Sequence, residues 1–396
     1  MAIGDVTMGK ILFIYERDMP TVSITRECFQ YLNSIGKIES NFCQVQKIST
    51  ADVNAADILF FIRPNDSMSL KIARQAKKSG RLIVVMHDDD LLNLPEENPF
   101  APWRKKSMIS LLEITDVLIS SSQYLIDKYK EKFNIQRDGR IDTIVREEEF
   151  SNYEDDNHDE VKLVYAASPK HVGLFNQFIL PILPELCERY GHKISLTCVG
   201  LYPEIDKFKE KLNISVISSM PLLKYRKYMQ EQRFDIGLAP LITNDFTKCK
   251  YFNKYLEYST ARIVGVYSNT EPYSYVIRDG VNGFLADDDP KDWLSKLCLA
   301  IEDKNLRNSC VENAVLQIKQ NHTAEMIADR LIWDIPEIAE GCPAKETVND
   351  PKNGAIKYKI YRILDTVYLS IFYLKKGGIK EFLYKTKVHV NERNRV

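Results

Sequence analysis

The sequence lacks several motifs that would assign it to a common class. The first apolar run, Ile11–Tyr15, is followed by E-R-D-M-P rather than G-x-G-x-x-G, which disfavours a nicotinamide dehydrogenase. A Walker loop and the G-x-S-x-G motif of hydrolases are also missing. The eight cysteines form no C-x-x-C pair, so we expect reduced thiols rather than a disulfide framework or a zinc site.

Charge and hydropathy disfavour two further classes. The net charge of −1 differs from the basic balance of a general nucleic-acid binder, so we expect no nucleic-acid partner. No stretch reaches the roughly 20 apolar residues of a membrane-spanning helix. The first apolar run is too short for a signal peptide and is followed by charge. We therefore expect a cytoplasmic protein, with any membrane attachment peripheral and on the inner face of the plasma membrane.

Short apolar runs alternate along the chain with amphipathic stretches of helical length. The runs are rich in Ile, Val, Leu and Phe and show little polar alternation, which is typical of strands buried on both faces. This alternation predicts an α/β fold with parallel sheets wrapped by helices. The expected helices include 25–34 and 69–79, and the expected strands are 11–15, 58–62, 82–86, 117–120, 143–145, 163–167, 194–199, 215–217, 236–239, 263–267 and 284–286.

An acidic segment divides the chain into two similar halves. Eight of the fourteen residues from Glu147 to Glu160 are acidic, which predicts a solvated linker. Because 396 residues exceed one ordinary core, we predict two Rossmann-like domains, residues 1–150 and 160–340, and a separate tail, 350–396. Ligands bind outside the carboxyl ends of parallel strands, so we expect these ends of the two domains to face one cleft.

The tail combines positive charge with helical periodicity. Residues 351–396 contain eleven Lys and Arg and three acidic residues, a local net charge of +8. The apolar residues recur every three or four positions, which predicts one apolar helix face surrounded by basic residues. Two interpretations stay open: binding to an anionic membrane surface, or packing across the first domain. The apolar positions are Ile356, Ile360, Ile363, Val367, Ile371 and Leu374, and the basic ones Lys357, Lys359, Arg362, Lys375 and Lys376.

Residues 246–283 carry the most informative chemistry. We expect a helix over Tyr251–Thr260, whose N-terminal end favours an anion. Lys250 and Lys254 are four residues apart, so both can lie on one helix face and neutralise a diphosphate. Glu257 follows on the same side and can accept hydrogen bonds from two sugar hydroxyls. The alternative is a surface helix with an ordinary Lys–Glu pair.

This stretch resembles the donor site of glycosyltransferase family 4. That family has a helix reading K-x-x-E-Y, a strand, and then P-Y-x-x-x-I-x-D-G-x-N-G-x-L, which appear here as Lys254–Tyr258 and Pro272–Leu285. The resemblance covers about residues 160–335, is weaker over 10–150 and is absent after 350. It implies a GT-B fold, with two Rossmann-like domains. It also implies retaining sugar transfer from a nucleoside diphosphate sugar without a metal or cofactor.

The resemblance also implies roles for donor-binding residues. Glu257 would contact the nucleotide ribose, Lys250 or Lys254 would hold the diphosphate, and Tyr273 belongs to the donor-binding segment. In relatives, the loop after the first strand of the second domain carries a basic residue that meets the phosphates. The loop here begins Ser168-Pro-Lys170-His, which suggests Lys170 with Ser168 as a hydroxyl donor, although an ordinary exposed lysine is the alternative.

One position departs from the family pattern. Many members carry two glutamates separated by seven residues, whereas the position eight before Glu257 is Cys249. The donor sugar is therefore not specified. The same departure keeps open a non-catalytic partner subunit that retains the fold.

The first domain has its own candidate residues. His87-Asp88-Asp89-Asp90 follows an apolar run, and four titratable groups at the end of a buried strand are costly without a purpose. A histidine at the matching place in family 4 touches the donor sugar. The run also looks like the D-x-D-D segment of a bacterial subgroup of polysaccharide transferases, which pair it with an arginine such as Arg63. We therefore expect His87 and Asp88 to be catalytic, with Arg17 and Arg63 on the acceptor side.

The acidic run has two other interpretations. Capping of a following helix is the structural alternative. A metal-binding D-x-D motif of the single-domain GT-A class is disfavoured because the chain shows two domains.

Together these features predict a glycosyltransferase in bacterial cell-surface polysaccharide synthesis. The acceptor would be a glycan or a lipid-linked molecule. The charge that develops on the leaving diphosphate would be offset by the helix end and by Lys170, Lys250 and Lys254. Besides the partner subunit, a sugar-nucleotide epimerase of the same fold is an alternative.

Overall fold

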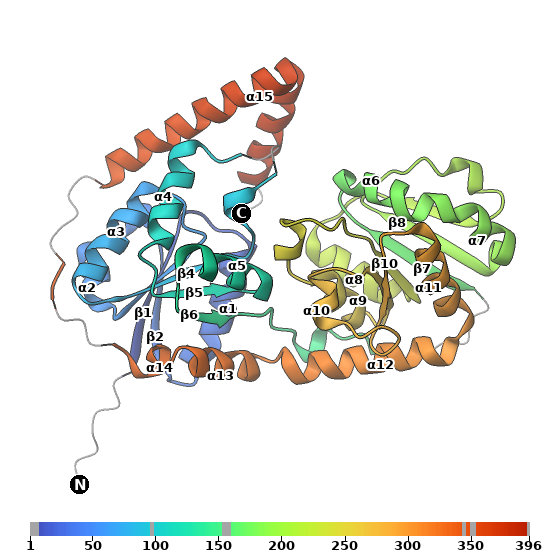
Figure 1. Cartoon of the computed structure of the whole chain (residues 1–396), viewed down its shortest axis with the longest axis horizontal. Coiled ribbons are helices and arrows are strands. Elements are labelled where there is room, and N and C mark those ends of the chain that lie inside the picture. Colours follow the sequence, from blue (N-terminus) through green and yellow to red (C-terminus); the bar gives the residue numbers. More distant parts are fainter. Residues whose placement is uncertain (1–7, 96–98, 153–159, 343–345, 349–353, 394–396) are drawn as a thin grey trace, which may run out of the picture. The chain divides into compact units, whose positions relative to one another are not determined.

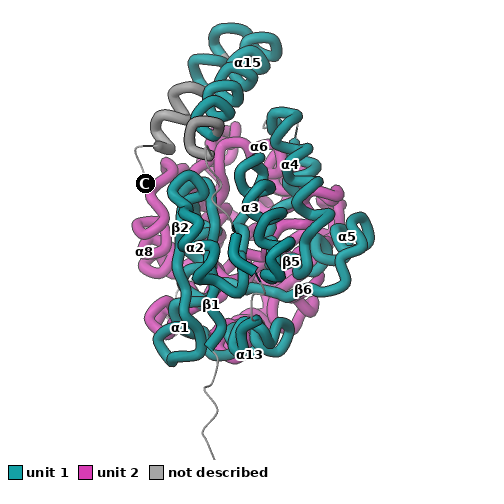
Figure 2. The backbone as a smooth tube through the Cα atoms, turned by 90° about the vertical axis from the view of Figure 1, so that its left-hand side faces the viewer, with its two compact units in different colours: residues 1–144, 324–396 teal, residues 145–323 magenta. Residues whose placement is uncertain are grey.

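A computed structural model describes residues 8–95, 99–152, 160–342, 346–348 and 354–393. The chain forms two compact units, unit 1 with residues 1–144 and 324–396 and unit 2 with residues 145–323 (Figure 2). Each unit contains a six-stranded parallel sheet with helices packed against it (Figure 1). The predicted α/β class with two Rossmann-like domains is confirmed.

The sheet of unit 1 has the strand order β2-β1-β3-β4-β5-β6. All five pairs are parallel, and the central strands are buried because helices cover the sheet. The strands are β1 (Gly9–Tyr15), β2 (Ile38–Gln44), β3 (Ile58–Ile62), β4 (Leu82–Met86), β5 (Val117–Ser120) and β6 (Arg137–Arg140). The helices are α1 (Pro20–Ser34), α2 (Thr50–Ala55), α3 (Ser67–Lys78), α4 (Pro102–Leu112), α5 (Gln123–Phe133), α13 (Ala324–Asp334), α14 (Glu337–Glu340) and α15 (Gly354–Arg393).

The sheet of unit 2 has the order β12-β11-β10-β7-β8-β9 and is also parallel throughout. Its core contains large buried aromatic side chains, among them Trp293, Tyr255 and Tyr258. The strands are β7 (Val161–Ala166), β8 (Ile194–Val199), β9 (Asn213–Ile217), β10 (Ile236–Ala239), β11 (Val264–Ser268) and β12 (Phe284–Ala286). The helices are α6 (Val172–Leu174), α7 (Leu183–Tyr190), α8 (Leu222–Gln232), α9 (Asn253–Thr260), α10 (Tyr273–Val276), α11 (Pro290–Glu302) and α12 (Lys304–Asn321).

In both sheets the first strand of the unit lies in the middle, and later strands pair on both sides of it. In unit 1, β1 lies between β2 and β3, and in unit 2, β7 lies between β8 and β10. Loops that leave such a central pair run in opposite directions, which opens a crevice at the carboxyl ends of the strands. The two switch points therefore mark where each unit can bind a ligand.

The edge strands of unit 1 differ from the sequence prediction. The expected strand at 143–145 is wrong, because β6 precedes it at Arg137–Arg140 and the chain is irregular after residue 140. β6 and β2 were not predicted. Both lie at the edges of the sheet, where one side of a strand is open to solvent. Their sequences, R-D-G-R and I-E-S-N-F-C-Q, contain no apolar run.

The division between the units also differs from the predicted boundaries. α13 and α14 precede the predicted boundary at residue 340, yet Ile327, Leu331 and Ile338 are buried in the core of unit 1. The acidic segment after residue 146 belongs partly to unit 2, where Glu147 pairs with Lys319 at 2.6 Å. Residues 153–159 of the predicted linker lie outside the described residues.

Helix α15 is the longest element of the chain. It turns at Gly378, whose φ of +66° lies in the left-handed region that favours glycine. Among the described residues, no helix is both long enough and apolar enough to cross a membrane.

Candidate functional site

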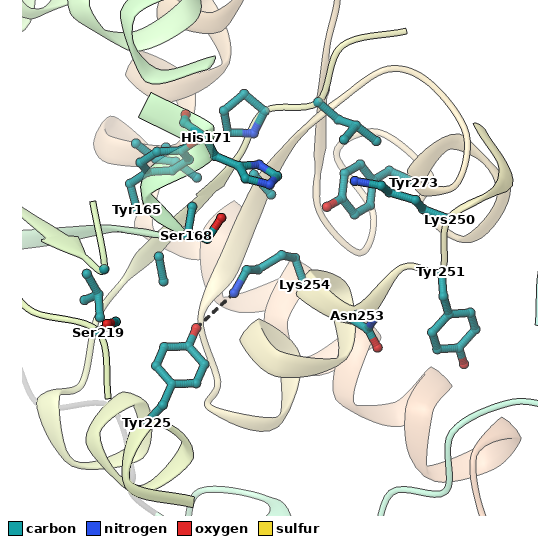
Figure 3. A pocket seen from close by; sticks show the side chains of 18 of the residues that line it. Tyr165, Ser168, His171, Ser219, Tyr225, Lys250, Tyr251, Asn253, Lys254 and Tyr273 are labelled. Carbon is teal, nitrogen blue, oxygen red and sulfur yellow. Dashed lines mark hydrogen bonds between the residues drawn. The ribbon is translucent and has the colours of Figure 1, made fainter. Parts of the chain in front are cut away.

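A pocket of about 400 Å³ opens at the switch point of unit 2 (Figure 3). The carboxyl ends of β7, β8 and β10 form its base, and residues around the start of α9 form one wall. Four residues predicted to bind the donor line this pocket: Ser168, Lys250, Lys254 and Tyr273. The structure thus brings together side chains from three separate segments of the sequence.

Gly200 provides close backbone packing at the base of the pocket. It directly follows β8 and has φ +83°, which L side chains rarely adopt. A Cβ at this position would lie 2.5 Å from the backbone oxygen of Ala167, the residue that follows β7. Only glycine therefore allows these two strand ends to approach so closely at the base of the pocket.

Positive charge is concentrated in the pocket. The amine of Lys250 points toward the His171 ring, while Lys254 extends toward Tyr225 (Figure 3). Burial lowers the pKa of His171, and Lys250, Lys254 and Lys170 lower it further because three ammonium groups disfavour a fourth positive charge. A site with this electrostatic character suits an anion such as a diphosphate.

The two pocket lysines do not share a helix face. α9 begins at Asn253, and Lys250 ends the short turn Thr247–Cys249 in an extended conformation. The observed helix therefore starts two residues later than the predicted helix over 251–260. The prediction that both lysines lie on one face of this helix is wrong. Both lysines nevertheless line the pocket, because the extended residues turn Lys250 toward it.

Glu257 and Lys254 form an ion pair on α9, which is the pair that the alternative interpretation describes, and Glu257 itself does not line the pocket. The Nζ of Lys254 lies 2.5 Å from Oε2 of Glu257. It also lies 3.1 Å from the hydroxyl of Tyr225, and 5.1 Å from the centre of that ring. The carboxylate is thus held beside the pocket by its neighbours, and both of these neighbours line the pocket.

Tyr225 of α8 is a pocket residue that the sequence analysis missed. Its hydroxyl donates to Oε2 of Glu257 at 3.0 Å. Burial, and secondly the Glu257 carboxylate, raise the pKa of Tyr225 well above its ordinary value. No motif marks this tyrosine in the sequence, because its role depends on the packing of α8 beside α9.

The remaining predicted donor residues occupy different environments. Tyr273 is buried and packs its ring 4.9 Å from the ring of Tyr267, so only part of it faces the pocket. Lys170 is exposed on the loop after β7 and does not line the pocket. The Cys249 thiol is buried, with Sγ 3.1 Å from the backbone oxygen of Asp245, and it too does not line the pocket.

The D-G-x-N-G segment stabilises a turn. The Asn282 side chain accepts from the backbone N–H of Arg278 at 2.7 Å and donates to the hydroxyl of Tyr255 at 3.0 Å. Asp279 accepts from the backbone N–H of Leu285 at 2.9 Å. These contacts position the segment that carries Tyr273 rather than presenting the motif itself to a ligand.

Unit 1 gathers a second cluster at the carboxyl ends of β3 and β4. Arg63 follows β3 with φ +49°, a conformation that costs energy for a residue with a Cβ. Its Nη1 lies 2.7 Å from Asp88 and 3.4 Å from Asp89. The hydroxyl of Thr21, on α1, also donates to Asp88. The predicted pairing of Arg63 with the acidic run is present, and all three charged groups remain partly exposed.

His87 and Asp90 are more deeply buried than the side chains of this cluster. The His87 ring is fully buried, and neither nitrogen has a hydrogen-bond partner among the described residues. Asp90 accepts hydrogen bonds from Tyr129 and Asn93, both at 2.8 Å, and makes no helix cap with its side chain. Asp90 therefore stabilises the fold. Arg17, the other predicted acceptor-side residue, is exposed after β1.

The burial of His87 predicts an acid-sensitive fold. Burial, with a smaller effect of Arg63, lowers the pKa of His87 from 6.5 to about 3, although Asp88 and Asp90 oppose the shift. The unfolded chain therefore binds a proton at His87 more readily than the folded chain does. The free energy of unfolding should therefore fall as the pH drops from about 6.5 toward 3, by at most about 1.4 kcal/mol per pH unit.

Urea unfolding at several pH values measures this dependence. His87→Gln should flatten the slope between pH 6.5 and pH 4, whereas His192→Gln, at an exposed position of unit 2, should leave it unchanged. An equal slope in the wild type and in His87→Gln would show that His87 does not stay neutral in the folded protein.

Among the described residues, no cluster of three or more His, Cys, Asp or Glu side chains is arranged to hold a metal ion. The independence of the reaction from metals stays a prediction.

Comparison with known proteins identifies the fold. No protein-family model and no curated protein matches the sequence. Similar solved structures include Anabaena HepE in complex with UDP and glucose, with 12% identity and a TM-score of 0.56 over 83% of this chain and 100% of HepE. A glycosyltransferase from Rickettsia africae matches with 12% identity and a TM-score of 0.58 over 84% and 99% of the two chains.

The lipopolysaccharide outer core galactosyltransferase WaaB is similar over the same share of the chain. It has 14% identity and a TM-score of 0.53, covering 83% of this chain and 99% of WaaB. The chain has the GT-B fold. At such low identity the likeness establishes the fold and not the reaction.

Proposed function

We propose that the protein is a glycosyltransferase that uses a nucleoside diphosphate sugar. The observation that carries this proposal is the cationic pocket at the switch point of unit 2, which Lys250, Lys254 and His171 line. Similar folds in complexes with UDP support it. The pocket is large enough for part of a nucleotide sugar, and its charge matches a diphosphate.

In the proposed donor complex, the diphosphate lies against Lys250, Lys254 and the Ser168 hydroxyl, with Lys170 adding charge at the entrance. The ribose hydroxyls bind Glu257, and Tyr273 packs beside the donor. Bond cleavage places negative charge on the leaving diphosphate. Fixed ammonium groups stabilise that charge more than they stabilise the ground state, and this difference lowers the barrier.

On the acceptor side, we propose roles for the cluster of unit 1. Asp88, held by Arg63 and Thr21, orients the acceptor hydroxyl by accepting its hydrogen bond. His87 lies next to it in the chain as a neutral ring, since the pKa of His87 is lowered to about 3. Arg63 and the exposed Arg17 contact an anionic acceptor group.

The finer features of the proposal follow the family resemblance. The reaction retains the anomeric configuration, needs no metal, and takes place in the synthesis of a bacterial cell-surface polysaccharide. The acceptor is a glycan or a lipid-linked molecule. WaaB, described as an outer core galactosyltransferase, supports this setting.

Turnover by the purified chain tests the proposal against its alternatives. UDP-, GDP- and dTDP-sugars are incubated with the protein, and products are followed by NMR. Slow hydrolysis that releases the nucleoside diphosphate and an initially retained sugar anomer is the expected result. An intact nucleotide sugar with an inverted ring carbon would indicate an epimerase instead. Nucleotide binding with neither reaction, even when acceptor glycans are supplied, would favour a non-catalytic partner.

The pocket lysines should discriminate between a diphosphate and a free nucleoside. Lys254→Ala and Lys250→Ala should each weaken nucleoside diphosphate binding by about 1.5–3 kcal/mol, since each removes a charge-assisted contact. Binding of the free nucleoside should change far less. Calorimetric titration measures both, with Lys227→Ala on the exposed side of α8 as the matched control. Equal losses for both ligands would contradict the assignment.

A further inference from the structure

Helix α15 is attached to unit 1 by a polar network. Asp365 accepts hydrogen bonds from Trp103 Nε1 and Arg104 Nε, both at 2.7 Å. Arg104 also pairs with Glu16 at 2.8 Å. Glu16 in turn accepts from Tyr358 at 2.9 Å and pairs with Arg362 at 3.0 Å. Arg104, together with Arg362 and Tyr358, lowers the pKa of Glu16 to about 2 although burial opposes the shift.

The opposite face of the helix is apolar and exposed. An α-helix turns about 100° per residue, so a position two residues further along lies on the other side. Each attachment residue, Tyr358, Arg362 and Asp365, is followed two positions later by an apolar residue. The exposed fractions are 51% for Ile360, 63% for Ile363, 49% for Val367, 48% for Ile371 and 42% for Leu374.

This arrangement bears on both interpretations of the tail. The helix packs on unit 1, as the second interpretation expects, through the side that carries Asp365 and Tyr368. The predicted apolar face stays exposed, so this packing does not cover it. The side chains of Ile356 and Lys357 lie outside the described ones. After the turn at Gly378, Ile379 and Leu383 are also exposed, at 69% and 58%.

The charge around this surface favours one kind of partner. Lys359 and Lys375 are exposed next to the apolar residues Ile360 and Leu374, and Lys376 and Lys380 are exposed near the turn at Gly378. Asp365 is the one acidic residue between 354 and 380, and it is buried in the attachment network. A second copy of this face would bring like charges together. An anionic bilayer surface instead offers acyl chains for the apolar residues and lipid phosphates for the lysines.

The attachment lies near the carboxyl ends of the strands of unit 1, where the cluster of Arg63 and Asp88 also lies. Glu16 directly follows β1, and Asn65, which accepts from Arg104, lies two residues after Arg63. The polar network therefore joins α15 to the loops after β1 and β3. A helix bound to a bilayer would hold these strand ends of unit 1 near the lipid surface.

We propose that α15 binds the surface of an anionic bilayer through Ile360, Ile363, Val367, Ile371 and Leu374, with the exposed lysines contacting lipid phosphates. The polar network makes the helix a fixed part of unit 1. If the proposed function holds, this binding presents lipid-linked acceptors to the Arg63–Asp88 cluster, and the acceptor class is lipid-linked.

Sedimentation with vesicles tests the proposal. The full-length protein should sediment with vesicles of phosphatidylglycerol and phosphatidylcholine at low salt, and far less with phosphatidylcholine alone. High salt should weaken binding, because screening shortens the reach of the lysine charges. Ile363→Glu combined with Ile371→Glu should reduce partitioning at least about tenfold. Leu299→Glu combined with Leu316→Glu, which makes the same change at exposed positions of unit 2, should have no effect.

Three outcomes would overturn the proposal. They are absence of binding to anionic vesicles, equal binding to neutral vesicles, and equal losses in both double variants. A wild-type dimer that Ile363→Glu with Ile371→Glu dissociates, without vesicle binding, would identify a second copy as the partner. The thermal shift produced by nucleoside diphosphates is measured on the same proteins. Its absence would contradict the proposed function and leave the vesicle result standing.

Discussion

Glu257→Gln is expected to reduce sugar transfer at least about tenfold, a loss of about 1.4 kcal/mol of transition-state stabilisation, while the fold stays intact. The substitution preserves the shape of the side chain and removes its charge. In the structure one oxygen, Oε2, accepts from both Lys254 and Tyr225. Without the carboxylate, Lys254 loses the partner that positions it, and the ribose loses a charged acceptor.

Steady-state kinetics and thermal unfolding together measure this effect. Glu231→Gln, on the exposed side of α8 where Glu231 pairs with Lys227 at 3.5 Å, is the matched control and should behave as the wild type. Tyr225→Phe should reduce transfer less than Glu257→Gln, because it removes one hydrogen bond and leaves the charge. Wild-type kinetics for Glu257→Gln would exclude Glu257 from the donor site.

Arg104→Ala should lower the free energy of unfolding of unit 1 by about 3 kcal/mol, because it leaves two carboxylates without their main partner in a largely buried position. The Arg104 side chain is 11% exposed, and those of Glu16 and Asp365 are 14% and 11% exposed. The same change should loosen α15, since Asp365 would keep only the hydrogen bond from Trp103.

Urea unfolding and limited proteolysis of α15 measure the two effects. Arg74→Ala removes an exposed arginine from α3 and should change stability by no more than about 0.5 kcal/mol. A stability of Arg104→Ala within that margin of the wild type, with unchanged cleavage of α15, would show that the network does not hold the helix.

Apolar runs made most of the fold predictable. Strands β3, β4 and β5 of unit 1 were placed with their observed bounds, since each is a continuous apolar run buried between helices. The edge strands β2 and β6 carry polar residues and were missed. The contribution of α13 to unit 1 was also missed, because helical periodicity shows that a helix is buried without showing which sheet covers it.

The donor pocket was predictable where charge and motif coincide. Ser168, Lys250 and Lys254 were identified from sequence and line one pocket. The extended conformation of Lys250 was not predicted, because the short turn before α9 has no clear sequence signal. Tyr225 was missed because its contact with Glu257 joins residues 32 positions apart.

The tail shows the same limit. Periodicity predicted the apolar face of α15, but its attachment depends on Arg104 and Asp365, which are 261 positions apart. Contacts between such distant residues follow from tertiary packing, which local sequence patterns do not encode.

A thermal-shift measurement with UDP, GDP and dTDP, each compared with its free nucleoside, tests the central claim most directly. A ligand at one hundred times its dissociation constant stabilises the folded state by about 2.7 kcal/mol. If the pocket binds the diphosphate, at least one nucleoside diphosphate should raise the unfolding temperature far more than its nucleoside does, and Lys254→Ala should remove most of this difference. No shift with any of the three at millimolar concentration, or a full shift in Lys254→Ala, would contradict the assignment of this pocket as a nucleotide-sugar site.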